Sequence, residues 1–247
     1  MNISSYLDST YLKTAKQANI SEKENSVLVQ KFVQETIDEK FKLVMIRPDK
    51  IALAKKLIDS QHSNVLIGTV IGFPEGTYTI DEKLQEAQQT ITDGADELDF
   101  VVNYEAFKLG EIDLVKDEIF QGTQLALAHN KTVKWIIEIA ALNGAQIIQL
   151  TSLIKNVVVA NFKEKDFENV FVKSSTGFYK TLDGSPNGAT FPAIIAMLEN
   201  AFPLSVKASG GIKTKEEALE MIKLGVKRIG TSSAKAISEG IETSGSY

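Results

Sequence analysis

Residues 204–233, LSVKASGGIKTKEEALEMIKLGVKRIGTSS, contain one complete strand, helix and strand unit and decide the fold. The short apolar runs at Leu204–Gly210 and Arg228–Ser232 predict two buried strands. Between them, Thr214 precedes Lys-Glu-Glu at the start of a predicted helix, Thr214–Leu224, which is a good N-terminal helix signal. Strands that alternate with helices in this way form parallel sheets.

The same alternation continues through the rest of the chain. Further strands are predicted at Tyr6–Leu12 (a weak signal), Lys42–Arg47, Val65–Phe73, Glu97–Asn103, Val133–Ile139 and Asn169–Ser175. Helical segments between strands include Pro48–Ser60, Ile80–Asp93, Asp113–Asn130, Ala145–Val159 and Gly188–Ala201.

Eight strands in about 250 residues favour a closed barrel over an open doubly wound sheet, and no G-x-G-x-x-G follows an early strand. The predicted fold class is therefore α/β, as a single (β/α)₈ TIM barrel. We expect one barrel domain over residues 1–238 and a flexible C-terminal tail over residues 239–247.

The composition excludes several kinds of chemistry. No cysteine is present, which removes disulfides, thiolate nucleophiles and cysteine-based zinc sites. The two histidines, His62 and His129, are predicted to be solvated at the surface, which disfavours a Ser-His-Asp triad and any metal site built from several imidazoles. We expect neither a metal nor a cofactor.

Charge and hydropathy limit the partners. The chain has 27 Lys+Arg against 32 Asp+Glu and a net charge of −5, which argues against a nucleic-acid binder. The longest apolar run, Val65–Phe73, is too short to span a bilayer. We expect a cytoplasmic protein that binds neither nucleic acid nor membranes and forms a homodimer.

Charged residues interrupt strands that otherwise look buried. Asp99, Lys173 and Lys207 each follow or interrupt an apolar run, and Lys134 and Glu138 fall on one face of a single strand. A structural ion-pair network inside the barrel is one interpretation. Position favours function, because Asp99, Lys173 and Lys207 come near the carboxyl ends of their strands, where barrel active sites are built.

Two lysines and a carboxylate suit aldol chemistry. An amine whose pKa is depressed by burial and by a neighbouring ammonium group attacks carbonyls to form a Schiff base. The second lysine would then perturb the first, and Asp99 would move protons. The residue types alone leave both Lys173 and Lys207 as candidates for the nucleophile.

Glycine-rich segments follow the last two strands. Ser209–Lys213 follows the seventh strand and Gly230–Ala234 the eighth, where barrels hold phosphate groups with backbone N–H donors. Each glycine pair taken alone is more often a simple turn. Ser174–Gly177, directly after Lys173, offers a third set of donors.

At these residues the sequence resembles the deoxyribose-phosphate aldolases over nearly the whole chain. The resembling segments, in order, are Tyr6–Thr10, Gly72–Pro74 with Gly76, Gly94–Asp99, Val133–Glu138, Val172–Gly177, Val206–Thr214 and Gly230–Ser233.

The resemblance implies a substrate and roles for individual residues. It implies reversible, cofactor-free cleavage of 2-deoxy-D-ribose 5-phosphate to acetaldehyde and D-glyceraldehyde 3-phosphate, so the partners would be a small-molecule sugar phosphate and aldehydes. Lys173 looks like the Schiff-base lysine, Lys207 its cationic neighbour and Asp99 the proton-relay acid. The substrate and phosphate contacts would be Asp8, Thr10, Gly177, Gly210, Gly211, Gly230, Ser232 and Ser233.

Some positions depart from the family pattern. Ser9 stands where histidine is common, Ile139 where threonine is usual, and residues 178–187 replace a shorter, glycine-richer loop. The sequence also differs at Tyr104-Glu105, after Asn103. Two alternatives stay open: a Schiff-base barrel aldolase for another sugar phosphate, and a barrel that binds a sugar phosphate without catalysis.

Tyr247 ends the predicted tail and has two interpretations. It is either an incidental residue of a disordered terminus or a phenol that reaches the barrel mouth. In the second case it would exchange a proton at the enamine carbon of bound acetaldehyde. We treat Tyr247 as a candidate catalytic residue.

Overall fold

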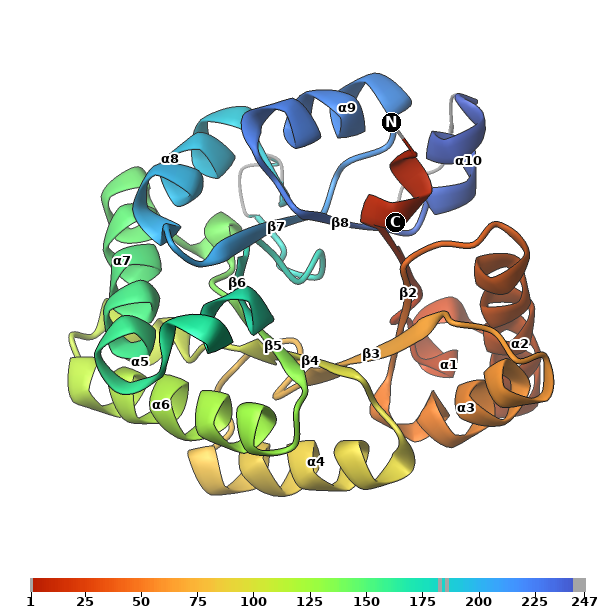
Figure 1. Cartoon of the computed structure of the whole chain (residues 1–247), viewed down its shortest axis with the longest axis horizontal. Helices are drawn as coiled ribbons and strands as arrows, with labels where there is room; N and C mark the ends of the chain where they lie inside the picture. Colours follow the sequence, from red (N-terminus) through yellow and green to blue (C-terminus); the bar gives the residue numbers. More distant parts are fainter. Residues whose placement is uncertain (1, 182–183, 185–186, 242–247) are drawn as a thin grey trace.

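The strands close into a barrel in chain order. The structure, a computed structural model, describes residues 2–181, 184 and 187–241. Within these residues eight parallel strands form the ring, and β1 pairs with β8 to close it (Figure 1). The strands are β1 Leu7–Thr10, β2 Leu43–Ile46, β3 Leu66–Ile71, β4 Glu97–Val101, β5 Thr132–Ile136, β6 Val170–Lys173, β7 Ser205–Ser209 and β8 Arg228–Thr231. The predicted (β/α)₈ barrel and its strands are confirmed.

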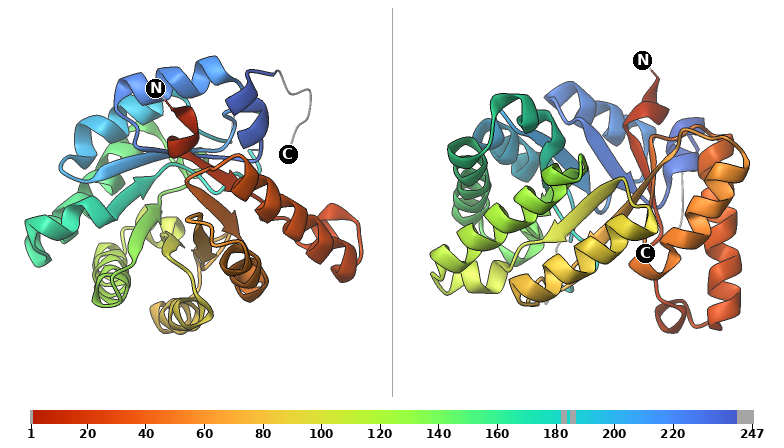
Figure 2. Two further views of the ribbon diagram at one scale, coloured as in Figure 1. Left: turned by 45° about the vertical axis from the view of Figure 1, so that its right-hand side comes forward. Right: turned by 60° about the horizontal axis from the view of Figure 1, so that its bottom comes forward.

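Helices surround this ring, as Figure 2 shows from two further directions. Those that match the predicted helical segments are α3 Ile51–Ser60, α4 Ile80–Asp93, α6 Ile112–Ala128, α7 Gly144–Asn161, α8 Phe191–Ala201 and α9 Lys215–Leu224. Short 3₁₀ turns occur at Ile3–Tyr6, Pro48–Lys50, Ile139–Ala141 and Glu164–Asn169. Further helices are α1 Ala15–Ala18, α2 Glu22–Asp38, α5 Tyr104–Lys108 and α10 Ala234–Glu239.

The long helix α2 is additional to the predicted set. Its buried face includes Asn25 and Thr36 as well as Val29 and Val33, so polar residues interrupt the apolar period. Its start is nevertheless well defined by a capping box, in which the Ser21 hydroxyl accepts from Glu24 N–H and the Glu24 carboxylate accepts from Ser21 N–H.

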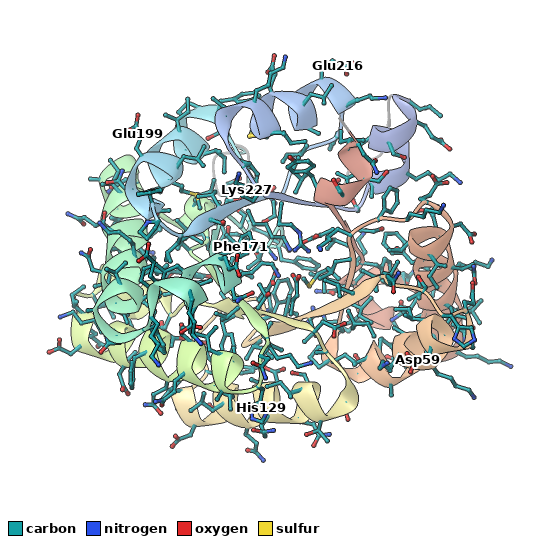
Figure 3. The ribbon with its side chains drawn as sticks, viewed as in Figure 1. Asp59, His129, Phe171, Glu199, Glu216 and Lys227 are labelled. Atoms are coloured by element: carbon teal, nitrogen blue, oxygen red, sulfur yellow. The ribbon has the colours of Figure 1, made fainter. Side chains whose placement is uncertain are left out.

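The strands separate two environments. Outward-facing residues such as Phe100 and Trp135, whose ring centroids lie 4.9 Å apart, pack beneath the helices in the main apolar core. Inward-facing positions carry most of the buried charge. In Figure 3, Phe171 lies near the middle of the ring and His129 at the outer edge of the molecule. His62 and His129 are both exposed, as expected.

A membrane-spanning helix and a metal site were looked for in the described residues alone. Over residues 2–181, 184 and 187–241, no helix is long and apolar enough to cross a membrane. In the same part of the chain, no group of three or more His, Asp or Glu side chains is arranged to hold a metal ion. Residues 242–247, which include Tyr247 and most of the predicted tail, lie outside the described residues.

Candidate active site

Asp99 lies at the centre of three lysines inside the barrel. Its Oδ2 accepts from Lys173 Nζ at 2.8 Å and from Lys207 Nζ at 3.0 Å, and its Oδ1 accepts from Lys134 Nζ at 2.8 Å. The four side chains come from β4, β5, β6 and β7, and all are buried. They meet because alternate residues of each barrel strand point inward.

A second set of charges completes this network. Lys207 Nζ lies 2.6 Å from Asp8 Oδ2, Lys134 also pairs with Glu97, and Arg228 bridges Asp8 and Glu97. Among the described residues the network therefore contains three carboxylates and four cationic side chains. One positive charge is in excess, which favours loss of a proton from the cation with the weakest pairing.

Lys173 is that cation. Within the part of the chain that the structure describes, it has one carboxylate in ion-pair range, Asp99, whereas Lys134 and Lys207 have two each. Arg228 also has two, and a guanidinium does not lose its proton in proteins. The geometry thus distinguishes Lys173 from Lys207.

The electrostatics agree with this assignment. Burial lowers the pKa of Lys173, the Asp99 carboxylate opposes that effect, and Lys207 and Lys134 lower the pKa further, to about 8. For Lys134, burial lowers the pKa, but Asp99 and Glu97 outweigh it and raise the pKa above its usual value. Burial also raises the pKa of Asp99, yet the three ammonium groups hold it well below the usual range.

A cavity of about 690 Å³ opens above Lys173. Its lining includes Thr10 from β1 and the glycines and serines predicted to hold a phosphate, namely Gly177, Gly210, Gly211, Gly230, Ser232 and Ser233. Asp99 and Lys207 do not line it; Asp99 accepts a hydrogen bond from Lys173 and another from Lys207. Asp8 does not line the cavity, and the structure places it in the ion network below.

Two of the loops around this cavity touch backbone to backbone. Ala189 N–H donates to the carbonyls of Ser209, at 3.2 Å, and Gly210, at 2.9 Å. A Cβ atom placed on Gly188 would lie 2.3 Å from the carbonyl carbon of Gly210. The close approach therefore requires glycine at position 188, and it brings the start of α8 beside the glycine pair after β7.

Several residues of the site are not apparent from the sequence. Glu97 and Arg228 look like ordinary strand ends, and Lys134 looks like a charge on a strand face, until the barrel register brings them beside Asp8 and Asp99. Asn187 and Thr190 line the cavity but belong to no motif. The residues that make these contacts lie on different strands and loops, so neighbouring positions in the sequence do not indicate that they meet.

Aromatic residues cover the other side of the barrel mouth. Phe178 packs edge-on against Phe73 with ring centroids 5.1 Å apart, and Tyr179 packs against Tyr104 at 6.3 Å. The guanidinium of Arg47 lies 4.8 Å from the centre of the Phe73 ring. Tyr104, Phe178 and Tyr179 belong to the segments that are predicted to depart from the family pattern.

Comparisons with known proteins agree with this geometry. The sequence profile described as DeoC/LacD family aldolase matches residues 10–241. The deoxyribose-phosphate aldolase of Thermococcus gammatolerans is 36% identical over 241 residues, which cover 97% of this chain and 96% of the relative.

Solved structures are similar over the same extent. The structure named "QR15, an Aldolase" has a TM-score of 0.79 and 31% identity, covering 97% of this chain and 95% of its own. The deoxyribose phosphate aldolase from Aeropyrum pernix has a TM-score of 0.75 and 28% identity, covering 96% and 89%. The barrel, the buried lysines and this match over nearly the whole sequence show that the chain belongs to the DeoC/LacD family of aldolases.

Proposed function

We propose that this protein is a class I, Schiff-base aldolase that reversibly cleaves 2-deoxy-D-ribose 5-phosphate to acetaldehyde and D-glyceraldehyde 3-phosphate. One observation carries the mechanism: Lys173, with a pKa lowered to about 8, lies at the floor of a cavity whose other walls are glycine-rich and serine-rich loops. The names of the relatives supply the substrate.

The reaction begins with the amine of Lys173. In its neutral form the amine attacks the C1 aldehyde of the open-chain sugar, and loss of water from the carbinolamine leaves a protonated imine. Removal of the proton from the C3 hydroxyl then breaks the C2–C3 bond, and the iminium accepts the electron pair. D-glyceraldehyde 3-phosphate departs, and the acetaldehyde enamine stays on Lys173.

The enamine is then converted to free product. Protonation of its C2 carbon and hydrolysis of the imine release acetaldehyde and restore the amine. Asp99 accepts from both Lys173 and Lys207, so it lies where protons can be relayed between the amine and the rest of the network. Tyr247 stays a prediction for the proton at C2, and comparison of wild type with Tyr247→Phe for deuterium entry into acetaldehyde tests it.

The phosphate would bind on the opposite side of the cavity from the aromatic residues. Gly210 and Gly211 have φ values of 85° and 78°, the left-handed region that favours glycine, and their backbone N–H groups would be donors to the phosphate. Gly230, Ser232 and Ser233 would add donors from the end of β8, and Thr10 would contact the sugar. Asp8 would act through Lys207.

Borohydride reduction tests the proposal directly. With acetaldehyde present, reduction should add the mass of an ethyl group to the peptide that contains Lys173, and the reduced enzyme should be inactive. Label on Lys207 alone would overturn the assignment. Formation of D-glyceraldehyde 3-phosphate from 2-deoxy-D-ribose 5-phosphate, followed with a coupled dehydrogenase, separates this activity from an aldolase for another sugar phosphate and from a barrel that only binds.

The assembly and location of the chain are also proposed. The relative from Aeropyrum pernix is described as a tetramer, and for this chain we propose a homodimer, which sedimentation velocity would distinguish from a monomer or a tetramer. A cytoplasmic location stays a prediction.

A further inference from the structure

Glu138 has a backbone conformation that is unusual for a buried residue. It follows β5 by two residues, with φ 53° and ψ 71°, and its side chain is completely buried. Among the described residues, the other non-glycine positions with positive φ are exposed residues at or just after helix ends: Asn19, Lys40, His62 and Asn130. A left-handed glutamate costs about 1–2 kcal/mol and persists where the surroundings require it.

The Glu138 carboxyl holds the segment that follows Lys173. Its Oε2 accepts from the backbone N–H of Thr176 at 3.0 Å and also from the Thr176 hydroxyl. The same hydroxyl oxygen accepts from Phe178 N–H at 3.0 Å. One carboxyl thus orients a threonine hydroxyl, and the threonine in turn holds the backbone of the next turn.

Thr176 connects this contact to the site. It lines the large cavity together with Lys173 and Gly177, and also a neighbouring cavity of about 230 Å³ whose lining includes Glu138, Tyr104 and Tyr179. Thr176, which Glu138 orients, therefore forms part of the wall between the two cavities.

The aromatic cover depends on the same segment. Phe178 and Tyr179 follow Thr176 after one residue, Gly177, and pack against Phe73 and Tyr104. Asn187 Nδ2 donates to the carbonyl oxygens of Gly177 at 3.3 Å and Tyr179 at 3.1 Å, which ties the far end of the loop to its start. Movement at Thr176 would thus displace both Gly177 and the aromatic pair.

The surroundings of Glu138 favour an uncharged carboxyl. In the described part of the chain no cationic side chain forms an ion pair with the Glu138 carboxyl, which is completely buried. Burial raises the pKa of Glu138 above its usual value, against the hydrogen bonds from Thr176, from the Ser175 side chain and from the backbone of Ala140. A neutral acid places a proton on one oxygen and accepts with the other, and glutamine reproduces that arrangement of donor and acceptor.

We propose that Glu138 is a positioning residue which, as an uncharged carboxylic acid, orients Thr176 and thereby sets the wall that separates the substrate cavity above Lys173 from the smaller, aromatic-lined cavity. This inference rests on the proposed function. It predicts that loss of the Glu138 contact impairs use of the phosphorylated sugar, which must fit that wall, more than capture of acetaldehyde, which needs the Lys173 amine alone.

The decisive comparison is Glu138→Gln against Glu138→Leu. The glutamine variant should keep KM for 2-deoxy-D-ribose 5-phosphate within about threefold of wild type, and the leucine variant should raise KM about tenfold, the factor that corresponds to one net hydrogen bond of ~1.4 kcal/mol. Both should label Lys173 with acetaldehyde and borohydride at close to the wild-type rate. Equal KM values in the two variants would overturn the proposal.

Thr176 supplies a second, milder test in case Glu138→Leu does not fold. Thr176→Ser keeps the hydroxyl and should raise KM less than Thr176→Val, which should raise KM as Glu138→Leu does. Since the two residues act through one contact, the double variant Glu138→Leu, Thr176→Val should be no worse than either single variant. Additive losses would show that Glu138 does not act through Thr176. Failure of wild type to label Lys173 would instead refute the proposed function.

Discussion

Lys173 Nζ lies 2.8 Å from Asp99 Oδ2, and within the described residues Asp99 is its single carboxylate partner. Asp99 shares that oxygen with Lys207 at 3.0 Å and uses its other oxygen for Lys134. A carboxylate divided among three ammonium groups stabilises the charge of any one of them incompletely. The amine that lines the substrate cavity is therefore the one that gives up its proton.

Schiff-base formation at Lys173 should depend steeply on pH. The pKa of about 8 leaves about a tenth of the amine neutral at pH 7. Because the neutral form is the nucleophile, the rate of borohydride-trappable adduct formation should rise about tenfold per pH unit below pH 8 and level off above it. A rate that is flat from pH 6 to 9 would contradict the assignment. Lys173→Ala should abolish trapping and turnover while remaining folded.

Replacement of Lys207 should move that profile to higher pH. Lys207→Leu removes a like charge that lowers the pKa of Lys173, and it also leaves Asp99 freer to stabilise the Lys173 ammonium group. Both effects raise the pKa of Lys173. The measurement is trapping rate against pH.

Lys227→Leu, which changes an exposed lysine one residue before Arg228, is the matched control. If the pH profile of Lys207→Leu is unchanged, burial, the largest cause of the lowered pKa of Lys173, lowers that pKa without a contribution from Lys207.

Asp99→Asn should have the opposite effect, because it removes the carboxylate that raises the pKa of Lys173. Trapping should then extend to lower pH although turnover falls.

Gly188→Ala should weaken phosphate binding without touching the lysines. Its new Cβ would collide with the backbone of Gly210, so the loop after β7 must shift. We expect KM for the phosphorylated sugar to rise at least about tenfold, the equivalent of ~1.4 kcal/mol, with little change in acetaldehyde trapping. Gly144→Ala, where nothing lies near the added atom, is the control. Equal KM values in the two variants would contradict the packing argument.

The buried pair of Lys83 and Glu118 should support stability from outside the barrel lumen. Lys83 Nζ donates to the carbonyls of Gly76 at 2.7 Å and Val101 at 2.8 Å as well as to Glu118. Lys83→Met leaves a buried carboxylate unpaired and should lower the free energy of unfolding by about 3–5 kcal/mol.

The loss from Lys83→Met should depend on pH in a defined direction. Burial already raises the pKa of Glu118, and without Lys83 the folded-state pKa rises further above the unfolded value. Protonation then favours the folded state, so the loss should be smaller at pH 5 than at pH 8 in urea unfolding. A loss that grows as the pH falls would contradict this account. Lys83→Met with Glu118→Leu should lose less than the sum of the two single changes.

The strands and the convergence of Asp99, Lys173 and Lys207 could be predicted from the sequence because both follow from local patterns. Apolar runs mark the strands, and every strand of a closed parallel barrel ends at the same rim. Thr10 and the predicted glycines and serines line the cavity for the same reason.

What could not be predicted depends on contacts across the barrel. The residue types leave both Lys173 and Lys207 as candidates, and the resemblance alone favours Lys173. The physical difference is how many carboxylates each lysine meets, and Asp8 and Arg228, 220 positions apart, supply part of that balance. The left-handed turn at Glu138 leaves no trace in the spacing of apolar residues. Helix α2 could not be predicted from the spacing of apolar residues because two polar residues, Asn25 and Thr36, lie on its buried face.

The packed lumen beneath Lys173 has a kinetic consequence. Phe171, Glu97 and Arg228 fill it, and none of the three is more than 7% exposed. Small molecules therefore enter and leave by the same opening, and no back exit exists through this part of the barrel. In the proposed reaction acetaldehyde is still joined to Lys173 after the carbon–carbon bond breaks, whereas the phosphorylated product is free to leave. The proposal therefore predicts a fixed order of release, the glyceraldehyde phosphate first, and predicts that added glyceraldehyde phosphate recaptures the enamine before it hydrolyses.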